Sequence, residues 1–328
     1  METDVPDPFF IRVRQFLLRP TIGPFIALLL ACAFFASQTS RFGTLTNFSF
    51  IFQQSVVVAV LAIGQTLIIL TGGIDLANGA IMGLGAVLMV NFATNDHINP
   101  FLATGLGIGI TVGMGFISGL LHTRLRLPPF IVTLGMLNIV SALTLIYTSE
   151  TVNAQKVQTF LGDTFTVGDS KVSYGTVVMM VLFFLTWLML RETVFGRHLY
   201  AIGNNRESVR LAGISTDRLL IAVYTLAGLF YGIAALMLVG RTGVAEPTSG
   251  VADSANLESI TAVVLGGTSL FGGRGNVLGT LVGALIVSVF RNGLLLMGIP
   301  SVVQILITGI LVIMAVSIDQ LSQRGGTR

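Results

Sequence analysis

Charged residues are scarce in this chain. Of its 328 residues only 10% are charged and 53% are hydrophobic, and the mean hydropathy is +0.87. A typical soluble domain carries about 25% charged residues, so this chain has too few to cover the surface of a soluble fold. The same numbers exclude a disordered chain, which would be rich in charge and poor in apolar residues. The composition therefore predicts a polytopic membrane protein.

Cysteine and lysine are nearly absent as well. Cys32 is the only cysteine, so the chain forms no intramolecular disulfide and no cysteine-rich metal site. The only lysines, Lys156 and Lys171, do not follow a glycine. The chain therefore has no G-x-x-x-x-G-K-[ST] loop that would cradle the phosphates of ATP.

Patterns of catalytic and metal-binding residues are also missing. The three histidines lie in three separate loops, and no serine or cysteine stands in a nucleophile-elbow context. We therefore expect no catalytic residue, no metal site and no cofactor on this chain. The basic residues are dispersed rather than clustered, which gives no indication of nucleic-acid binding.

Long apolar stretches, by contrast, are abundant. A membrane helix needs about 20 mostly apolar residues. The eighth stretch is short and runs into a glycine-rich segment, so it is either a complete span or a discontinuous one. The expected spans are roughly 21–37, 50–70, 77–94, 101–121, 129–148, 174–190, 219–240, 257–270, 277–296 and 300–317.

The basic residues favour cytoplasmic positions for both termini. With this orientation 13 of the 18 basic residues lie inside and four lie outside, as the positive-inside rule requires. We therefore expect a cytoplasmic tail at 1–20, a transmembrane domain at 21–318 and a second cytoplasmic tail at 319–328. The basic start of the chain also fits a secretory signal, but nine further apolar segments favour a retained first span. The inside residues are Arg12, Arg14, Arg19, Arg124, Arg126, Arg191, Arg197, Arg206, Arg210, Arg218, Arg274, Arg324 and Arg328.

Two of the loops between the spans stand out as polar. The outer loop 149–173 is either a solvated connector or a contact for an extracytoplasmic partner. The inner loop 191–218 is the most charged segment of the chain and predicts a short helix over 206–211. This helix is either a docking element for a soluble subunit or an ordinary amphipathic connector. Asn204 and Asn205 are suitable N-caps, Glu207 lies in the first turn with Arg206 and Arg210 nearby, and Gly213 marks the end.

Most polar side chains within the spans are neutral. Amides and hydroxyls suit an uncharged, hydroxyl-rich solute, although they also form hydrogen bonds between helices. The near absence of acidic residues argues against a proton relay. The candidates for a solute pathway are Gln65, Gly72, Gly73, Asp75, Asn78, Thr133 and Asn138.

Asp75 is the one acidic residue beside a hydrophobic stretch, and it has two interpretations. Its carboxylate can cap the helix that starts near Leu76, where the charge meets the positive helix end. Alternatively, it holds the chain break at Gly72 and Gly73 near the pathway. The first interpretation is favoured.

Glycines recur at four-residue spacing along several spans. Such faces let membrane helices approach closely. General bundle packing explains them better than a specific dimer contact. The sets are Gly79/Gly83, Gly105/Gly109/Gly113, Gly115/Gly119, Gly228/Gly232 and Gly279/Gly283.

Four blocks of sequence resemble the ribose/xylose/galactose class of ABC-importer permeases. The sequence TGGIDLANG at 71–79 is similar to the family signature, with Ala77 where the family often has serine. The other three blocks are LPPFIVTLG at 127–135, YAIGNN at 200–205 with the following AGI, and ITAVVLGGTSLFGGRG at 260–275. The resemblance extends from about residue 45 to 318, with the blocks in the family's order.

The resemblance implies an all-α membrane protein with the fold of the larger, roughly ten-helix importers, type II ABC permeases. It implies a bacterial inner-membrane permease that works with a cytoplasmic ABC ATPase, often a tandem one, and a periplasmic sugar-binding protein. A second permease copy, identical or related, would complete the pathway. ATP and Mg²⁺ would bind to the ATPase. The loop containing Asn204, Asn205, Arg206, Glu207, Arg210 and Gly213 would couple the permease to it.

Other functions remain open at this point. Within the same superfamily the solute can be a branched-chain amino acid, a nucleoside or a furanone-type signal. A self-sufficient, ion-coupled secondary transporter is a different class. A membrane enzyme is a third, although no acid/base pair supports it. The sequence does not identify the sugar.

Overall fold

The computed structural model describes residues 22–154, 157, 160–168, 170–247 and 250–325. These residues are mostly helical, as predicted. The helices are α2 (Ile22–Gln38), α3 (Leu45–Leu70), α4 (Asn78–Thr94), α5 (Pro100–Arg124), α6 (Pro129–Tyr147), α7 (Tyr174–Glu192), α8 (Val194–Leu211), α9 (Thr216–Thr242), α10 (Gly250–Leu265), α11 (Val277–Leu296) and α12 (Ser301–Gly325).

Six of the described helices are long and apolar enough to cross a membrane: α3, α5, α6, α7, α9 and α11. Shorter apolar helical segments lie at Ile22–Gln38, Asn78–Thr94, Ser254–Leu265 and Ser301–Ile310. Each of the ten stretches predicted from the sequence falls on one of these helices. This number of apolar helices is typical of a helical bundle embedded in a bilayer.

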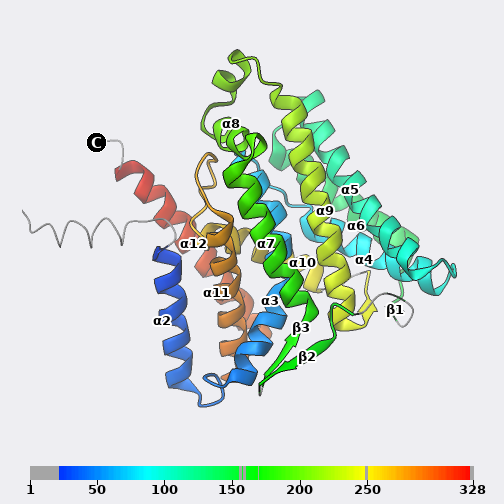
Figure 1. The fold of residues 1–328 in the computed structure, drawn as a ribbon, viewed down its shortest axis with the longest axis vertical. Coiled ribbons are helices and arrows are strands. Elements are labelled where there is room, and N and C mark those ends of the chain that lie inside the picture. The colour runs from blue at the N-terminus through cyan, green and yellow to red at the C-terminus, as the bar shows by residue number, and fades with distance from the viewer. Residues whose placement is uncertain (1–21, 155–156, 158–159, 169, 248–249, 326–328) are drawn as a thin grey trace, which may run out of the picture.

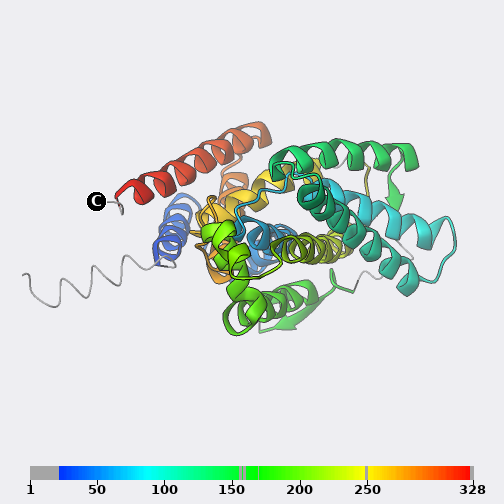
Figure 2. The same ribbon diagram turned by 90° about the horizontal axis from the view of Figure 1, so that it is seen from above.

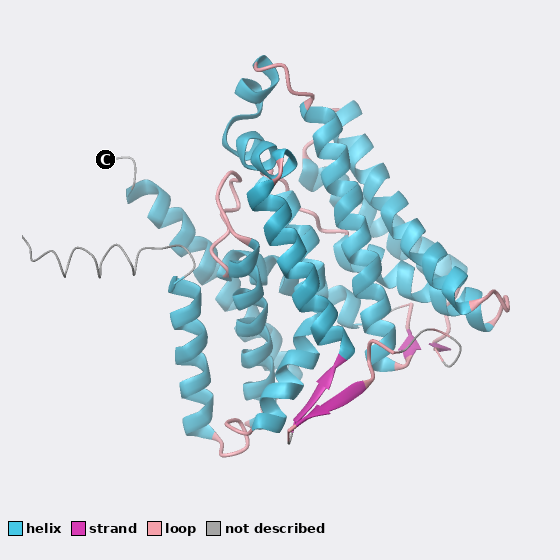
Figure 3. Cartoon of the chain, viewed as in Figure 1, coloured by secondary structure: helices cyan, strands magenta, loops and turns pink. Residues whose placement is uncertain are grey.

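The helices form a bundle with distinct ends (Figures 1 and 2). At the upper end in Figure 1 lies α8, and at the lower end lies a small hairpin of strands, magenta in Figure 3. The central helix is α3, which is buried at every position from 55 to 70. It packs against α9, α10 and α11, so three segments distant in sequence converge on it.

The lower end contains strands that the all-α prediction missed. β2 (Thr164–Val167) and β3 (Ser170–Ser173) form an antiparallel hairpin within the outer loop 149–173. β1 (Val152–Asn153) pairs with β4 (Val244–Ala245), which joins the same loop to the end of α9. Valine, threonine and phenylalanine favour strands, and pairing satisfies the backbone groups of the loop. The loop is therefore partly ordered by its own backbone rather than being an irregular connector.

Several helices end in the same way. After α3, Gly72 adopts φ +80°, its N–H donates to the carbonyl of Ile69 over 2.9 Å, and the N–H of Gly73 donates to Ile68 over 3.1 Å. This is the Schellman arrangement, in which a left-handed residue that favours glycine satisfies the last carbonyls. Gly267 ends α10 by the same pattern. The helix α10 therefore stops at Leu265, five residues before the predicted end of the eighth span.

Two of the predicted glycine faces meet each other. A Cβ at Gly115 would lie 3.1 Å from the Cα of Gly228, and a Cβ at Gly119 would lie 3.0 Å from the Cα of Ile221. The backbones of α5 and α9 are therefore in direct contact. The Gly105/Gly109/Gly113 face behaves differently, because a Cβ at any of the three would meet no described atom within 4 Å.

Candidate coupling surface and membrane site

The predicted short helix in the inner loop is present. At Asn205 the backbone is extended (φ −161°, ψ 97°), which divides α8 into a first part at 194–204 and a second part at 206–211. The Asn205 Oδ1 accepts a hydrogen bond from the N–H of Ser208 over 2.9 Å, as an N-cap does. Gly213, with φ +83°, follows the end of this helix as predicted. The cap belongs to Asn205 alone, since Asn204 ends the preceding part.

The sequence did not reveal that the loop begins with a helix. The first part of α8 is capped by Thr193, whose side chain accepts from the N–H of Gly196 over 3.1 Å. Residues 194–204 are too polar to resemble a membrane span. The spacing of their apolar residues is also too irregular to predict an amphipathic helix. This part supports the 206–211 helix at the end of the bundle (Figure 1).

The 206–211 helix presents exposed charges. Arg210 binds both carboxylate oxygens of Glu207 at 3.1 and 2.6 Å, and this hydrogen bonding lowers the pKa of Glu207. Arg206 forms an ion pair of 2.9 Å with Asp217 at the start of α9. Leu211 is 77% exposed, which places an apolar side chain beside the charges. A surface of this kind suits a protein partner rather than a small ligand.

We predict that Asn205→Ala loosens the 206–211 helix. Loss of an N-cap costs ~1 kcal/mol, which corresponds to about five-fold faster hydrogen exchange of the Ser208 amide if exchange follows local opening. Asn204→Ala is the matched control, because Asn204 provides no cap to this helix. Equal exchange at Ser208 in the two variants would contradict the assignment.

The first part of α8 touches the bundle through glycines. Gly203 meets the carbonyl of Leu70 and the backbone of Gly273 so closely that a Cβ at this position would overlap both. A Cβ at Gly272 would lie 2.8 Å from the N of Gly72 and 3.1 Å from the Cα of Gly203. We call Gly72, Gly203, Gly272 and Gly273 the glycine junction. It joins α8 to the end of α3 and to the loop after α10.

The junction is also held by hydrogen bonds. The Gly273 N–H donates to the Leu70 carbonyl over 2.9 Å. The Tyr200 hydroxyl donates to the Gly275 carbonyl over 3.0 Å. The first bond joins the loop after α10 to the end of α3, and the second joins α8 to the same loop.

Between α3 and α4 lies a non-helical segment, residues 71–77, which we call the break. Within it Asp75 is 1% exposed. Its Oδ1 accepts from the N–H of Ala77 over 2.7 Å, and its Oδ2 accepts from the hydroxyl of Tyr231 over 3.0 Å. The carboxylate therefore binds a backbone donor just before α4 and also a side chain of α9. The predicted cap of a helix that starts near Leu76 is not formed, because α4 starts at Asn78 with Ala77 as its N-cap and no side-chain cap. Asp75 instead holds the turn before the helix through the Ala77 N–H.

Amides surround the break. Gln65 faces the main chain of Asp75. With its amide oriented to satisfy both groups, its nitrogen donates to the Asp75 carbonyl over 3.1 Å and its oxygen accepts from the Asp75 N–H over 3.2 Å. The Asn78 amide donates to the hydroxyl of Ser259 over 2.8 Å, and the N–H of Gly79 donates to Asn256 over 2.5 Å. Buried polar contacts thus connect the break to α3 and α9, and they connect the start of α4, directly after the break, to α10.

The remaining pathway candidates divide into two groups. Thr133 on α6 is fully buried and donates to the carbonyl of Ile74 over 3.1 Å, so it joins the break. Asn138 on the same helix is exposed and donates only to the carbonyl of Leu134 in its own helix, over 3.0 Å. Asn138 therefore lies apart from the network.

Sequence reasoning missed Tyr231, Asn256 and Ser259. The last two lie in the polar N-terminal half of α10, and their polarity within an apolar span was an available signal. Tyr231 gave no signal, because a tyrosine in a hydrophobic helix is ordinary. Only the fold brings it to Asp75, which lies 156 positions earlier in the chain.

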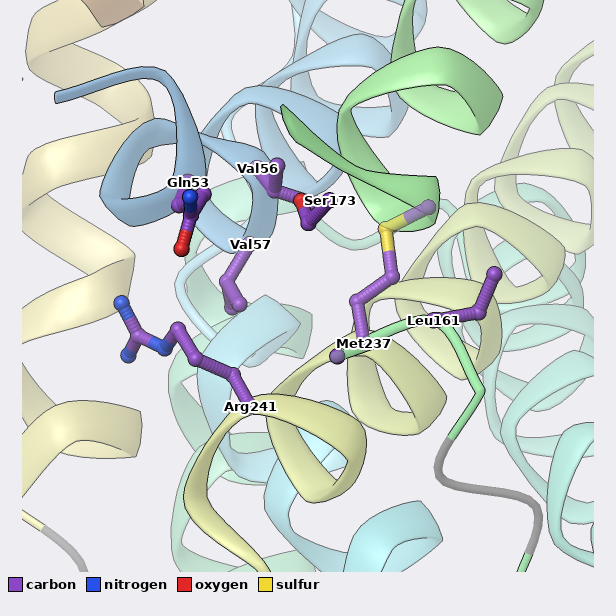
Figure 4. A pocket seen from close by; sticks show the side chains of 8 residues that line it. Gln53, Val56, Val57, Leu161, Ser173, Met237 and Arg241 are labelled. Carbon is purple, nitrogen blue, oxygen red and sulfur yellow. The ribbon is translucent and has the colours of Figure 1, made fainter. Parts of the chain in front are cut away.

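Two small cavities lie toward the lower end. The first, of about 20 Å³, is lined by residues that include Gln53, Ser173, Met237 and Arg241 (Figure 4). It has room for about one water molecule. The second, of about 180 Å³, lies between α4 and the end of α9 and includes Glu246 in its lining. Both are smaller than the ~300 Å³ at which ligand pockets typically begin.

The comparisons with known proteins cover nearly the whole chain. The fructose import permease protein FrcC of Rhizobium meliloti is 43% identical over 97% of this chain and 90% of the relative. The ribose import permease protein RbsC of Bacillus subtilis is 36% identical over 91% and 92%, respectively. The galactose/methyl galactoside import permease protein MglC of Haemophilus influenzae is 32% identical over 90% and 93%.

No solved structure matches the chain. Residues 47–316 match the family described as the permease component of the branched-chain amino acid transport system. This range contains the glycine junction, the break and the 206–211 helix. The chain belongs to this family of multi-pass membrane permeases.

Proposed function

We propose that this chain is the membrane-spanning permease subunit of a binding-protein-dependent ABC importer that carries a monosaccharide. The observation that carries the proposal is similarity over at least nine tenths of the chain to permeases named for fructose, ribose and galactose. A monosaccharide is favoured over an amino acid despite the family description, because these relatives are named for sugars. The sequence has no P-loop lysine, so ATP and Mg²⁺ bind to a separate ATPase subunit.

The proposed topology has ten spans in the bacterial inner membrane with both termini in the cytoplasm. The six long apolar helices and the four shorter apolar segments supply the spans. In Figure 1 the end that carries α8 is also the end to which the positive-inside rule assigns the cytoplasm. The hairpin of β2 and β3 then faces the periplasm.

We infer three protein partners, and the proposed topology indicates where two of them contact the chain. The ATPase, often a tandem protein, contacts the 206–211 helix and its charges. The periplasmic sugar-binding protein contacts the opposite end, which includes the outer loop 149–173. A second permease copy, identical or related, completes the pathway.

The sugar is identified by uptake. Proteoliposomes that contain this chain, its ATPase and its binding protein are loaded with ATP and supplied with labelled pentoses and hexoses. We expect saturable uptake of at least one monosaccharide. Uptake of a branched-chain amino acid or a nucleoside, with none of any monosaccharide, would contradict the proposed substrate class.

We predict that replacing Arg206, Glu207 and Arg210 together by alanine uncouples ATP hydrolysis from sugar uptake. Hydrolysis should no longer be stimulated by the sugar. These side chains are the exposed charges of the proposed ATPase contact, and sugar-stimulated hydrolysis requires that contact. Membrane insertion should be unchanged. The control is the double alanine variant of Arg191 and Glu192, an exposed ion pair of 3.1 Å at the end of α7. Normal sugar-stimulated hydrolysis in the triple variant would refute the contact.

A further inference from the structure

We propose that the hydrogen bond between Asp75 and Tyr231 carries movement of the 206–211 helix to the break. The inference rests on the proposed function, because it assumes that an ATPase moves this helix. It assigns a positioning role to two residues that lie deep in the bundle. The connection runs along α9, from the 206–211 helix to Asp75.

The start of α9 is attached to the 206–211 helix. The ion pair of 2.9 Å between Arg206 and Asp217 joins the two elements at the surface. Beneath it, Ile202, Val209 and Leu220 form a separate buried apolar cluster. These contacts come from both parts of α8 and from α9. A displacement of the 206–211 helix is therefore passed to the first turns of α9.

From this attachment α9 runs as one continuous helix to Tyr231 and beyond, Thr216–Thr242. It is stiffened by α5, since a Cβ at Gly119 would meet the Cα of Ile221 at 3.0 Å and one at Gly115 would meet the Cα of Gly228 at 3.1 Å. Close-packed helices move together because their interface does not deform continuously. The pair α5 and α9 is thus suited to act as a rigid body.

Tyr231 attaches this body to the break. Its ring is buried and lies close to Gly64, where a Cβ would be 2.7 Å from the ring. Its hydroxyl donates to Asp75 over 3.0 Å. Asp75 and Tyr231 are both buried, so breaking the bond without a new partner leaves two buried polar groups unsatisfied. Movement of α9 therefore pulls on the break.

The break passes the movement onward. Asp75 also accepts from Ala77, immediately before α4 starts at Asn78. The first residues of α4 are bonded to α10, through Asn78 to Ser259 and through Gly79 to Asn256. Asp75 thus connects α9 to the start of α4, which is itself bonded to α10.

The test compares two tyrosines of the same helix. Tyr231→Phe removes only the hydroxyl that binds Asp75. Tyr224→Phe removes a hydroxyl that is equally buried, two turns earlier, and has no hydrogen-bond partner among the described residues. Both variants are reconstituted with the ATPase and the binding protein. Solute transported per ATP hydrolysed is measured, together with the basal hydrolysis rate and the KM for ATP.

We expect Tyr231→Phe to lower transport per ATP about ten-fold, the size expected for a hydrogen bond to a charged group. The basal hydrolysis rate and the KM for ATP should be unchanged, since the ATPase contact is intact. Tyr224→Phe should match the wild type in all three quantities. A normal ratio in Tyr231→Phe, or an equal loss in Tyr224→Phe, would overturn the inference.

Asp75→Asn gives a second test if Tyr231→Phe does not assemble. Asparagine keeps an oxygen for Ala77, and the Tyr231 hydroxyl can accept from the new amide, so the bond remains with its direction reversed. Transport per ATP should fall by no more than about three-fold, because a neutral hydrogen bond replaces the charge-assisted one and the break stays attached to α9. A ten-fold loss in stably inserted protein would overturn the inference. Absence of sugar uptake by the wild-type complex would instead contradict the proposed function.

Discussion

Gly203→Val should abolish uptake and remove most of the correctly folded protein from the membrane. A Cβ at this position would overlap the Leu70 carbonyl and the backbone of Gly273, so α8 would have to separate from α3 and from the loop after α10. Overpacking costs ~1–3 kcal/mol even where only side chains must adjust. Here both neighbours are backbone, and we expect a cost at or above the upper value. Folded protein is measured as the monodisperse fraction after detergent extraction.

Gly23→Val is the matched control. Gly23 is also a helical glycine, in α2, but a Cβ there would meet no described atom within 4 Å. Its folded yield should match the wild type. If Gly203→Val and Gly23→Val gave the same yield and the same uptake, the glycine junction would not hold α8 in place.

Asp75→Leu should have a comparably large effect. It removes the acceptor of the Ala77 N–H at 2.7 Å and of the Tyr231 hydroxyl at 3.0 Å, and both donors remain buried. Each buried donor without a partner costs ~1–3 kcal/mol, and leucine also changes the shape of the site. We expect a lower thermal midpoint of the purified permease and no measurable uptake.

Asp75→Asn separates hydrogen bonding from charge. It should retain the thermal midpoint and most of the uptake, because an amide offers partners to both donors. An asparagine variant that is as stable as the wild type but inactive would show that the pathway needs the negative charge itself. That result would favour the alternative sequence interpretation, in which Asp75 acts beside the pathway.

Much of the fold follows from local sequence. Apolar length predicted the helices because a bilayer permits few other structures. The Asn205 cap and the Gly213 termination of the 206–211 helix were predictable, since each depends on one residue and its neighbours. The helical character of 194–204 was not, because its hydropathy and its pattern both resemble those of a loop.

Other features depend on residues far apart in the chain. Gln65, Asp75 and Asn78 were sequence candidates, and the fold does bring them together with Thr133 at the break. Asn138 follows Thr133 by five residues on α6, but it lies on the exposed side of that helix. A list of polar residues cannot indicate which helix face is buried. The role of these residues in transport is still a prediction.

The contact of Tyr231 with Asp75 also could not be predicted from the sequence. Neither residue predicts the other, because the pairing requires α9 to lie beside the break. The glycine junction also needs three separate segments to meet, at the end of α3, in α8 and after α10. Such contacts are consequences of tertiary packing, and local propensity carries no information about them.

The most direct test of the account is the energy source for uptake. Proteoliposomes with this chain alone, and with the chain plus its ATPase and binding protein, are given a labelled monosaccharide under either internal ATP or an imposed proton or sodium gradient. We predict uptake only for the complete complex with ATP, and none for the chain alone under any gradient. Gradient-driven uptake by the chain alone would contradict it and identify a secondary transporter.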